Sequence, residues 1–160
     1  MRFRTTWKMV CCALVLGAQG VLAASSAVTP TVSPGDRCHR CGRLITNPRL
    51  ATAVLGNHDK TRAFRTVGCL LAYLNDHPVT STRSFVTDDE TGTLVEASNA
   101  RFVPIVVDVF TGEPGYGTGP VDYLAFKSRK TAERFALAGG ASSMTWQAVL
   151  RYAAFRLGPP

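Results

Sequence analysis

Several common binding signatures are missing from this chain of 160 residues. The acidic run Asp88-Asp89-Glu90 does not alternate with other residues, so it lacks the ligand pattern of a calcium loop and is predicted to be an exposed turn. The glycine-rich residues 111–120 do not end in Gly-Lys-Ser/Thr, which argues against a phosphate-binding loop. Lysine and arginine outnumber aspartate and glutamate by 18 to 11, but they are scattered rather than clustered with aromatics. Binding to nucleic acid is therefore not expected.

The first 23 residues have the features of a secretory signal peptide. Three basic residues precede an uncharged run over residues 9–22, and Ala23 supplies the small residue expected at a cleavage site. The run is short for a membrane span, which needs about 20 apolar residues. We predict cleavage after Ala23 and a periplasmic location, with an uncleaved membrane anchor as the alternative. Cys11 and Cys12 lie outside a convincing lipidation pattern, so no lipid anchor is expected.

Three cysteines remain after the signal peptide: Cys38, Cys41 and Cys69. An odd number in an exported protein allows at most one intramolecular disulfide and leaves one thiol free, reactive or metal-bound. Cys38-His39-Arg40-Cys41 places two thiols and an imidazole within four residues. By itself this motif fits copper(I) or zinc binding, thiol–disulfide exchange or a short structural disulfide.

The remaining chain predicts a flexible linker over residues 24–35, rich in Ser, Thr, Ala and Pro, and a mixed α and β domain over residues 36–160. A strand–strand–helix–strand order over residues 50–87 recurs from residue 93 onward with a longer glycine-rich loop. Strands are predicted over residues 50–55, 61–65, 84–87, 93–96, 101–109 and 121–126, and helices over 67–74, 128–138 and 145–156.

Cys69 lies in the first turn of the predicted helix over residues 67–74, which Thr66 is expected to cap. Peptide dipoles at a helix N-terminus stabilise an anion, so a thiolate there is expected to have a pKa below about 8.5. The alternative is that Cys69 is a small buried hydrophobic residue. Pairing of Cys69 with a histidine for nucleophilic catalysis requires proximity that sequence does not show, and we predict that the protein is not an enzyme.

Several motifs together resemble the NosL family, the nitrous-oxide reductase accessory proteins, over roughly residues 36–140. No single motif carries this resemblance, but their order and spacing are fairly specific. The residues that carry it are Cys38-x-x-Cys41-Gly42, Ile45, residues 62–74, Phe85-Val86-Thr87-Asp88, Glu96-Ala97, Ala100, Tyr116-Gly117, Leu124-Ala125-Phe126, Ala132, Phe135 and Gly139-Gly140.

The resemblance implies an α+β fold of two related ββαβ halves, similar to organomercurial lyase, with halves near residues 36–90 and 91–160 and a C-terminal helix. It also implies a periplasmic copper(I) chaperone that supplies the copper centres of nitrous-oxide reductase. The expected partners are apo nitrous-oxide reductase or another periplasmic copper enzyme, with a membrane copper exporter as a further candidate. The lyase-like fold does not by itself imply lyase activity.

This chain departs from the family at the expected thioether ligands. Arg43 stands where the family usually has methionine after Cys-Gly, and Pro114-Gly115-Tyr116-Gly117 replaces a loop that usually offers another. Beyond the signal peptide the chain has one methionine, Met144, outside the matched region. The copper site implied by the resemblance therefore transfers only to Cys41, with Cys38 and Cys69 beside it.

The candidate ligands are Cys38, Cys41 and Cys69, with His39 as a further candidate, because copper(I) prefers thiolates supported by imidazole or thioether. His58 and His77 also lie in predicted turns, next to Asp59 and Asp76. Three functions stay open on the sequence: copper(I) delivery, thiol–disulfide exchange, and a binding or scaffold domain whose cysteines are bridged. Copper delivery is preferred, because no thioredoxin-like βαβ pattern surrounds the motif.

Overall fold

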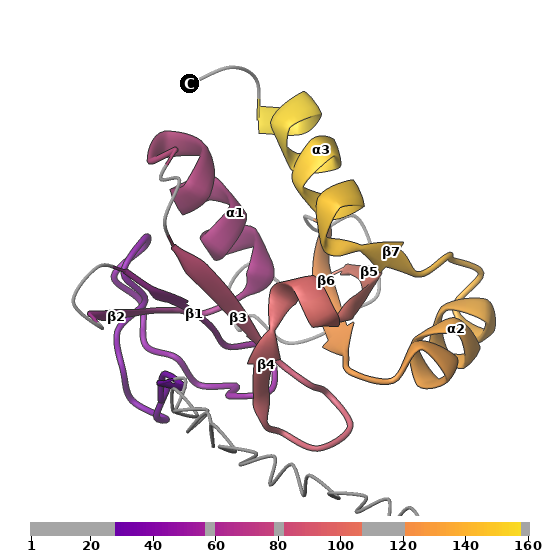
Figure 1. Cartoon of the computed structure of the whole chain (residues 1–160), viewed down its shortest axis with the longest axis horizontal. Helices are drawn as coiled ribbons and strands as arrows, with labels where there is room; N and C mark the ends of the chain where they lie inside the picture. Colours follow the sequence, from indigo (N-terminus) through magenta and orange to yellow (C-terminus); the bar gives the residue numbers. More distant parts are fainter. Residues whose placement is uncertain (1–27, 57–59, 79–81, 107–120, 158–160) are drawn as a thin grey trace, which may run out of the picture.

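The computed structural model describes residues 28–56, 60–78, 82–106 and 121–157, and Figure 1 shows their arrangement. These ranges form an α+β fold of two antiparallel sheets and three α-helices, which confirms the predicted fold class. The predicted signal peptide, His58 and the loop over residues 111–120 lie outside them. Within the described ranges, none of the helices combines the length and apolar character that crossing a bilayer requires.

The first sheet has four strands in the order β2-β1-β3-β4, with each neighbouring pair antiparallel. β1 is buried at every position because it lies between β2 and β3. α1 connects β2 to β3 in the chain. The elements are β1 (Thr52–Leu55), β2 (Thr61–Phe64), α1 (Val67–Asp76), β3 (Arg83–Thr87) and β4 (Leu94–Glu96).

The second sheet has three strands in the order β6-β5-β7 and repeats the topology of the first. In both sheets the chain runs strand, strand, helix, strand, and the first strand lies between the other two. This repetition confirms the ββαβ prediction. The elements are β5 (Arg101–Val106), β6 (Val121–Phe126), α2 (Arg129–Ala138) and β7 (Met144–Thr145), followed by the predicted C-terminal helix α3 (Trp146–Leu157).

β4 differs from the sequence prediction in its partner. The strand expected over residues 93–96 was assigned to the start of the second ββαβ set, but β4 pairs with β3 and extends the first sheet. The second set begins instead at β5. Pairing between strands depends on which edges meet in three dimensions, and a three-residue strand carries little pattern that specifies this.

Two predicted helix starts are confirmed by their capping hydrogen bonds. The Thr66 hydroxyl accepts a hydrogen bond from the backbone N–H of Cys69 at the start of α1. The Ser128 hydroxyl accepts one from the N–H of Thr131 at the start of α2. α2 ends at Gly139, and Gly140 follows with a φ of 66°, a conformation that favours glycine.

The main hydrophobic core lies between the sheets and the helices α1 and α3, which lie side by side in Figure 1. Cys38 is part of this core and is only 2% exposed. α2 covers β5 and β6 over a second, smaller core. The largest fully buried side chains are Phe64, Phe102, Ile45, Leu70, Val54 and Val67.

Asp88 joins the two sheets at the end of β3. It forms a parallel bridge with Ala125 of β6, and the next residue, Asp89, donates its N–H to the Ala125 carbonyl. The Asp88 carboxylate accepts hydrogen bonds from the N–H of Lys127 at 2.8 Å and from the Thr91 hydroxyl at 2.6 Å. The predicted turn over residues 88–90 is present, but its predicted exposure is wrong for Asp88, which is 1% exposed because its carboxylate links the sheets.

Candidate metal centre

A tight loop brings Cys38 and Cys41 to the same site. Arg37 and Leu44 form an antiparallel bridge at its base, and the Cys38 N–H donates to the Arg43 carbonyl at 2.9 Å. The Gly42 N–H donates back to the Cys38 carbonyl at 2.9 Å. Gly42 has a φ of 72°, in the left-handed region that glycine adopts without strain. Glycine after the second cysteine therefore permits the turn that the C-x-x-C spacing needs.

The loop is fixed to the first sheet through its backbone. The His39 N–H donates to the carbonyl of Ala63 in β2 at 2.8 Å. Beside this contact the Cys38 side chain enters the core, where Phe64 and Tyr73 belong to the same cluster. The position of Cys38 is therefore set by the sheet as well as by the loop.

Cys69 reaches the same place from the first turn of α1. Thr66, which caps this helix, accepts the Cys69 N–H at 3.3 Å and so fixes the residue at the start of the helix. The sulfur of Cys69 lies 4.0 Å from the sulfur of Cys41. The predicted position of Cys69 in the first helical turn is confirmed.

The three sulfur atoms form one cluster. All lie within 4.8 Å of one another, and no disulfide links them. Their exposure is graded: Cys38 is buried, Cys69 is half-buried and Cys41 is exposed. Such a cluster offers a soft ion three ligands, one of which faces solvent.

Within the cluster, the pKa values of Cys38 and Cys69 are shifted in opposite directions. A hydrogen bond with the Cys69 thiol lowers the pKa of Cys38 to about 4; burial opposes this effect, and backbone groups of Arg65, Cys41 and Arg40 reinforce it. The same hydrogen bond raises the pKa of Cys69, together with burial and the charges of the other two cysteines. The predicted lowering of the Cys69 pKa is therefore wrong, because these neighbours outweigh the helix N-terminus. The reduced site therefore holds a buried thiolate at Cys38 next to a protonated Cys69.

The ionised Cys38 leads to a first prediction. The reduced, metal-free protein should show the ultraviolet absorbance of one thiolate per chain well below the pKa of about 8.5 for a free cysteine, with a midpoint near pH 4. Cys38→Ser should remove this absorbance, whereas Cys41→Ser should retain it. A protein whose thiolates all appear near the ordinary pKa would contradict the assignment.

The described histidines, His39 and His77, are not part of the cluster. His39 is exposed, and its ring packs edge-on against Tyr73 with centroids 5.5 Å apart. His77 stacks on the other side of the helix residue Tyr73 at 4.5 Å. Within the described residues, the group of metal-ligating atoms consists of the three cysteines. Ligation by His39 therefore remains a prediction.

Met144 belongs to the second sheet. It occupies β7, where it pairs with Phe102, and it packs against the main core. A core position explains the residue without any ligand role. Among the described residues, the sulfur atoms shown to lie together are those of the three cysteines.

A second layer behind Cys69 was not predicted from the sequence. The Asp122 carboxylate accepts the N–H of Gly68 and of Tyr123, each at 2.8 Å, and also interacts with the Thr66 side chain. Burial raises the pKa of Asp122, which disfavours its ionised form, so these hydrogen-bond donors are needed to stabilise the carboxylate anion. An aspartate in the otherwise apolar strand over residues 121–126 was the available signal. The network ties the start of α1, and hence Cys69, to the second sheet.

Gly68 is required at this contact. A Cβ added to it would lie 2.9 Å from Oδ2 of Asp122, closer than such atoms normally approach. Glycine therefore lets the carboxylate reach the first turn of α1. Its role is close approach, because its φ lies outside the left-handed region.

Comparisons with known proteins identify a structural neighbour but no sequence family. No family model matches the sequence, and no curated protein matches it either. The structure is similar to that of the copper chaperone NosL from Shewanella denitrificans, with a TM-score of 0.53 and 19% sequence identity. The alignment covers 75% of this chain and 93% of the other. The chain therefore has a NosL-like fold.

Proposed function

We propose that this protein binds copper(I) through Cys38, Cys41 and Cys69 and delivers it to a periplasmic metalloenzyme, without catalysing a reaction of its own. The observation that carries the proposal is the meeting of three reduced sulfurs from two separate segments within 4.8 Å. The similarity in fold to a copper chaperone supports the same function.

The ligand chemistry favours copper(I) over zinc. Copper(I) is soft, and thiolates select it. Structural zinc sites almost always have four ligands in a closed tetrahedron, whereas this cluster has three sulfurs with one exposed. The site therefore suits a soft ion that is held and then released.

The graded exposure of the cysteines suits transfer. Cys38 supplies a buried thiolate, and Cys69 loses its proton when a metal replaces the shared hydrogen bond. Cys41 lies at the surface, where a sulfur or nitrogen ligand of a client can approach the ion. Stepwise exchange of ligands starting at Cys41 avoids release of free copper.

The surface around the cluster supports an acidic client. Arg37 and Arg40 are exposed and lie within two positions of Cys38 in the chain, and the half-exposed Arg62 and Arg65 lie within two positions of Ala63, whose carbonyl anchors the loop. Arg40 forms an ion pair with Asp76 at 3.0 Å. Basic residues at a docking face accelerate association with a negatively charged partner. Apo nitrous-oxide reductase is the proposed client, another periplasmic copper enzyme is the alternative, and a membrane copper exporter is the proposed source.

Anaerobic titration with copper(I) against a competing chelator tests the proposal. We expect one copper(I) per chain, a coordination shell dominated by sulfur in X-ray absorption, and no displacement by equimolar zinc. Copper-loaded protein should then restore the copper-dependent absorption of apo nitrous-oxide reductase faster than the copper–chelator complex does. Failure to compete with the chelator, or displacement by zinc, would overturn copper binding. Binding without transfer would overturn the proposed delivery.

Thiol–disulfide exchange is less well supported by the geometry. Reactive C-x-x-C pairs of oxidoreductases benefit from a helix N-terminus, but here the motif lies in a loop and Cys69 occupies the helix. The low-pKa sulfur is also the buried one. Rapid reduction of a protein disulfide by the metal-free protein would favour exchange over copper delivery.

A further inference from the structure

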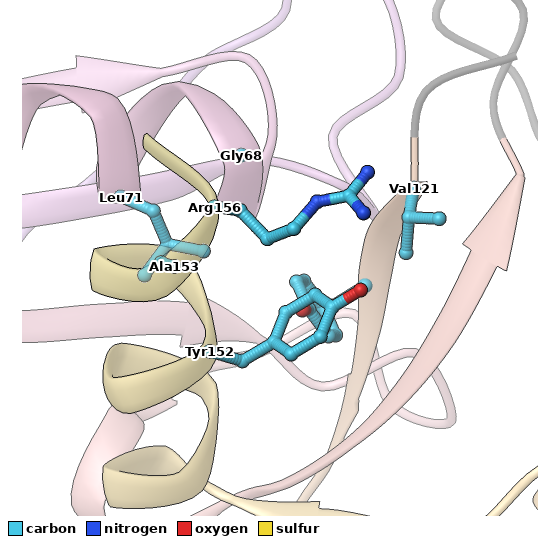
Figure 2. Close-up of a pocket in the computed structure, with 7 residues that line it drawn as sticks. Gly68, Leu71, Val121, Tyr152, Ala153 and Arg156 are labelled. Carbon is cyan, nitrogen blue, oxygen red and sulfur yellow. The ribbon is translucent and has the colours of Figure 1, made fainter. Parts of the chain in front are cut away.

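A small pocket separate from the sulfur cluster opens between α3, the first turns of α1 and the start of β6. Its volume is about 200 Å³, below the 300–1,000 Å³ of typical drug-sized sites. Figure 2 shows Tyr152 and Arg156 reaching from α3 toward Val121. The lining residues are Gly68, Leu71, Val121, Tyr123, Tyr152, Ala153 and Arg156.

The pocket combines apolar walls with one cation. Leu71, Ala153 and Val121 provide aliphatic surface, and Arg156 is the charged residue among the described residues that line it. Arg156 lies over the Tyr152 ring at 5.9 Å, and it has no ion pair with an acid in the described part of the chain. A guanidinium without an acidic partner beside apolar surface is suited to a carboxylate on an apolar group.

Tyr123 adds a hydrogen-bond donor to the pocket lining. The residue is 5% exposed and lines the pocket, and its hydroxyl forms no hydrogen bond to another described residue. A phenol hydroxyl that faces a pocket without a protein partner is free to donate to a ligand. Burial and the neighbouring Tyr152 and Asp122 raise the pKa of Tyr123, so its hydroxyl stays protonated.

Asp122 is not among the described residues that line the pocket. Its carboxylate accepts the N–H groups of Gly68 and Tyr123. Burial raises the pKa of Asp122, and the Thr66 side chain, these N–H groups and the charge of Arg65 oppose that rise. The carboxylate is therefore engaged at the start of α1. Arg156 and the Tyr123 and Tyr152 side chains remain as the polar groups of the pocket lining.

From this geometry we infer that the pocket binds a small carboxylate carried on a short apolar group, with Arg156 contacting the carboxylate, Tyr123 donating a hydrogen bond, and Leu71 and Ala153 contacting the apolar part. Calorimetric titration of the protein with hexanoate and phenylacetate, each compared with its uncharged amide, tests the inference. The carboxylates should bind at least about tenfold more tightly than the amides, because a charge-assisted hydrogen bond is lost in the amides.

Variants distinguish the pocket from non-specific binding. Arg156→Gln should weaken carboxylate binding about tenfold or more, and Tyr123→Phe should weaken it several-fold. Arg156→Lys should have an intermediate effect: it keeps the positive charge near the C-terminus of α3 but loses the planar donor pair. Arg151→Gln is the matched control, because Arg151 is exposed on the same helix and does not line the pocket.

Several outcomes would overturn the inference. Equal binding of carboxylates and amides, equal effects of Arg156→Gln and Arg151→Gln, or binding of inorganic phosphate in place of the carboxylates would each do so. If Tyr123→Phe is unstable, Arg156→Gln still decides the question, because its side chain is exposed. Copper(I) binding is measured separately and does not depend on these results.

Discussion

Cys38→Ser is expected to lower the affinity for copper(I) by about a hundredfold or more. Four-ligand zinc sites in small proteins contribute roughly 10–16 kcal/mol, so one sulfur ligand corresponds to about 3 kcal/mol. Cys38 is also the sulfur whose pKa is lowered to about 4, and it therefore offers a thiolate without prior loss of a proton. Competition with a chelator under anaerobic conditions, with circular dichroism to verify folding, measures the change.

The other two cysteines complete this series. Cys69→Ser should also weaken binding strongly, because its sulfur lies near both partners. Cys41→Ser is the variant least expected to disturb folding, because Cys41 is exposed. Met144→Leu is the matched control, since it removes the described thioether sulfur, which packs against the main core, and leaves the three thiols in place. Retained affinity in both Cys38→Ser and Cys41→Ser, or loss in Met144→Leu, would contradict the proposed ligand set.

Local pattern predicted each part of the sulfur cluster but not the assembled geometry. The C-x-x-C-Gly spacing predicted a tight loop, and Thr66 predicted the helix turn that holds Cys69. The meeting of Cys41 and Cys69, 28 positions apart, depends on the backbone contact of His39 with β2. Such a contact uses only N–H and carbonyl groups, which every residue carries, so the sequence holds no side-chain signal for it.

The layer behind the cluster shows the same limit. Asp122 was part of a strand prediction, and its carboxylate function is visible only when β6 approaches the start of α1. No sequence pattern marks Gly68, because its role depends on Asp122, which lies 54 positions away in the chain. A Cβ at Gly68 would come within 2.9 Å of the Asp122 carboxylate. Long-range packing, rather than local propensity, decides which polar residues support a site.

The fold was predictable where periodicity and capping are strong. α1, α2 and α3 were each predicted close to their observed positions, because apolar spacing and capping residues mark them. β4 was assigned to the wrong set, because a strand of three residues does not specify its partner. The sequence predicts an exposed Asp88 because an acidic run usually forms a solvated turn. Its burial depends on contact with the second sheet, which the sequence does not show.

Asp88→Ala is expected to reduce the free energy of unfolding by about 2–3 kcal/mol. The change removes hydrogen bonds from Thr91 and Lys127 and leaves the Lys127 N–H without its acceptor. Urea denaturation measures the loss. Asp89→Ala is the matched control, with an expected loss below about 1 kcal/mol, because its contact with Arg49 is a partly exposed ion pair at 4.0 Å.

The pH dependence of the same variants separates the charge of Asp88 from its shape. Burial alone would raise the pKa of Asp88, but the Thr91 hydroxyl and backbone N–H groups hold it below its ordinary value of 3.8. A lowered pKa stabilises the folded state above the ordinary value, and this contribution disappears as the pH falls through the folded pKa. The stability advantage of the native protein over Asp88→Asn should therefore be full at neutral pH and shrink in acid. A difference that stays constant with pH would show that the carboxylate joins the sheets by packing rather than by accepting hydrogen bonds as an anion.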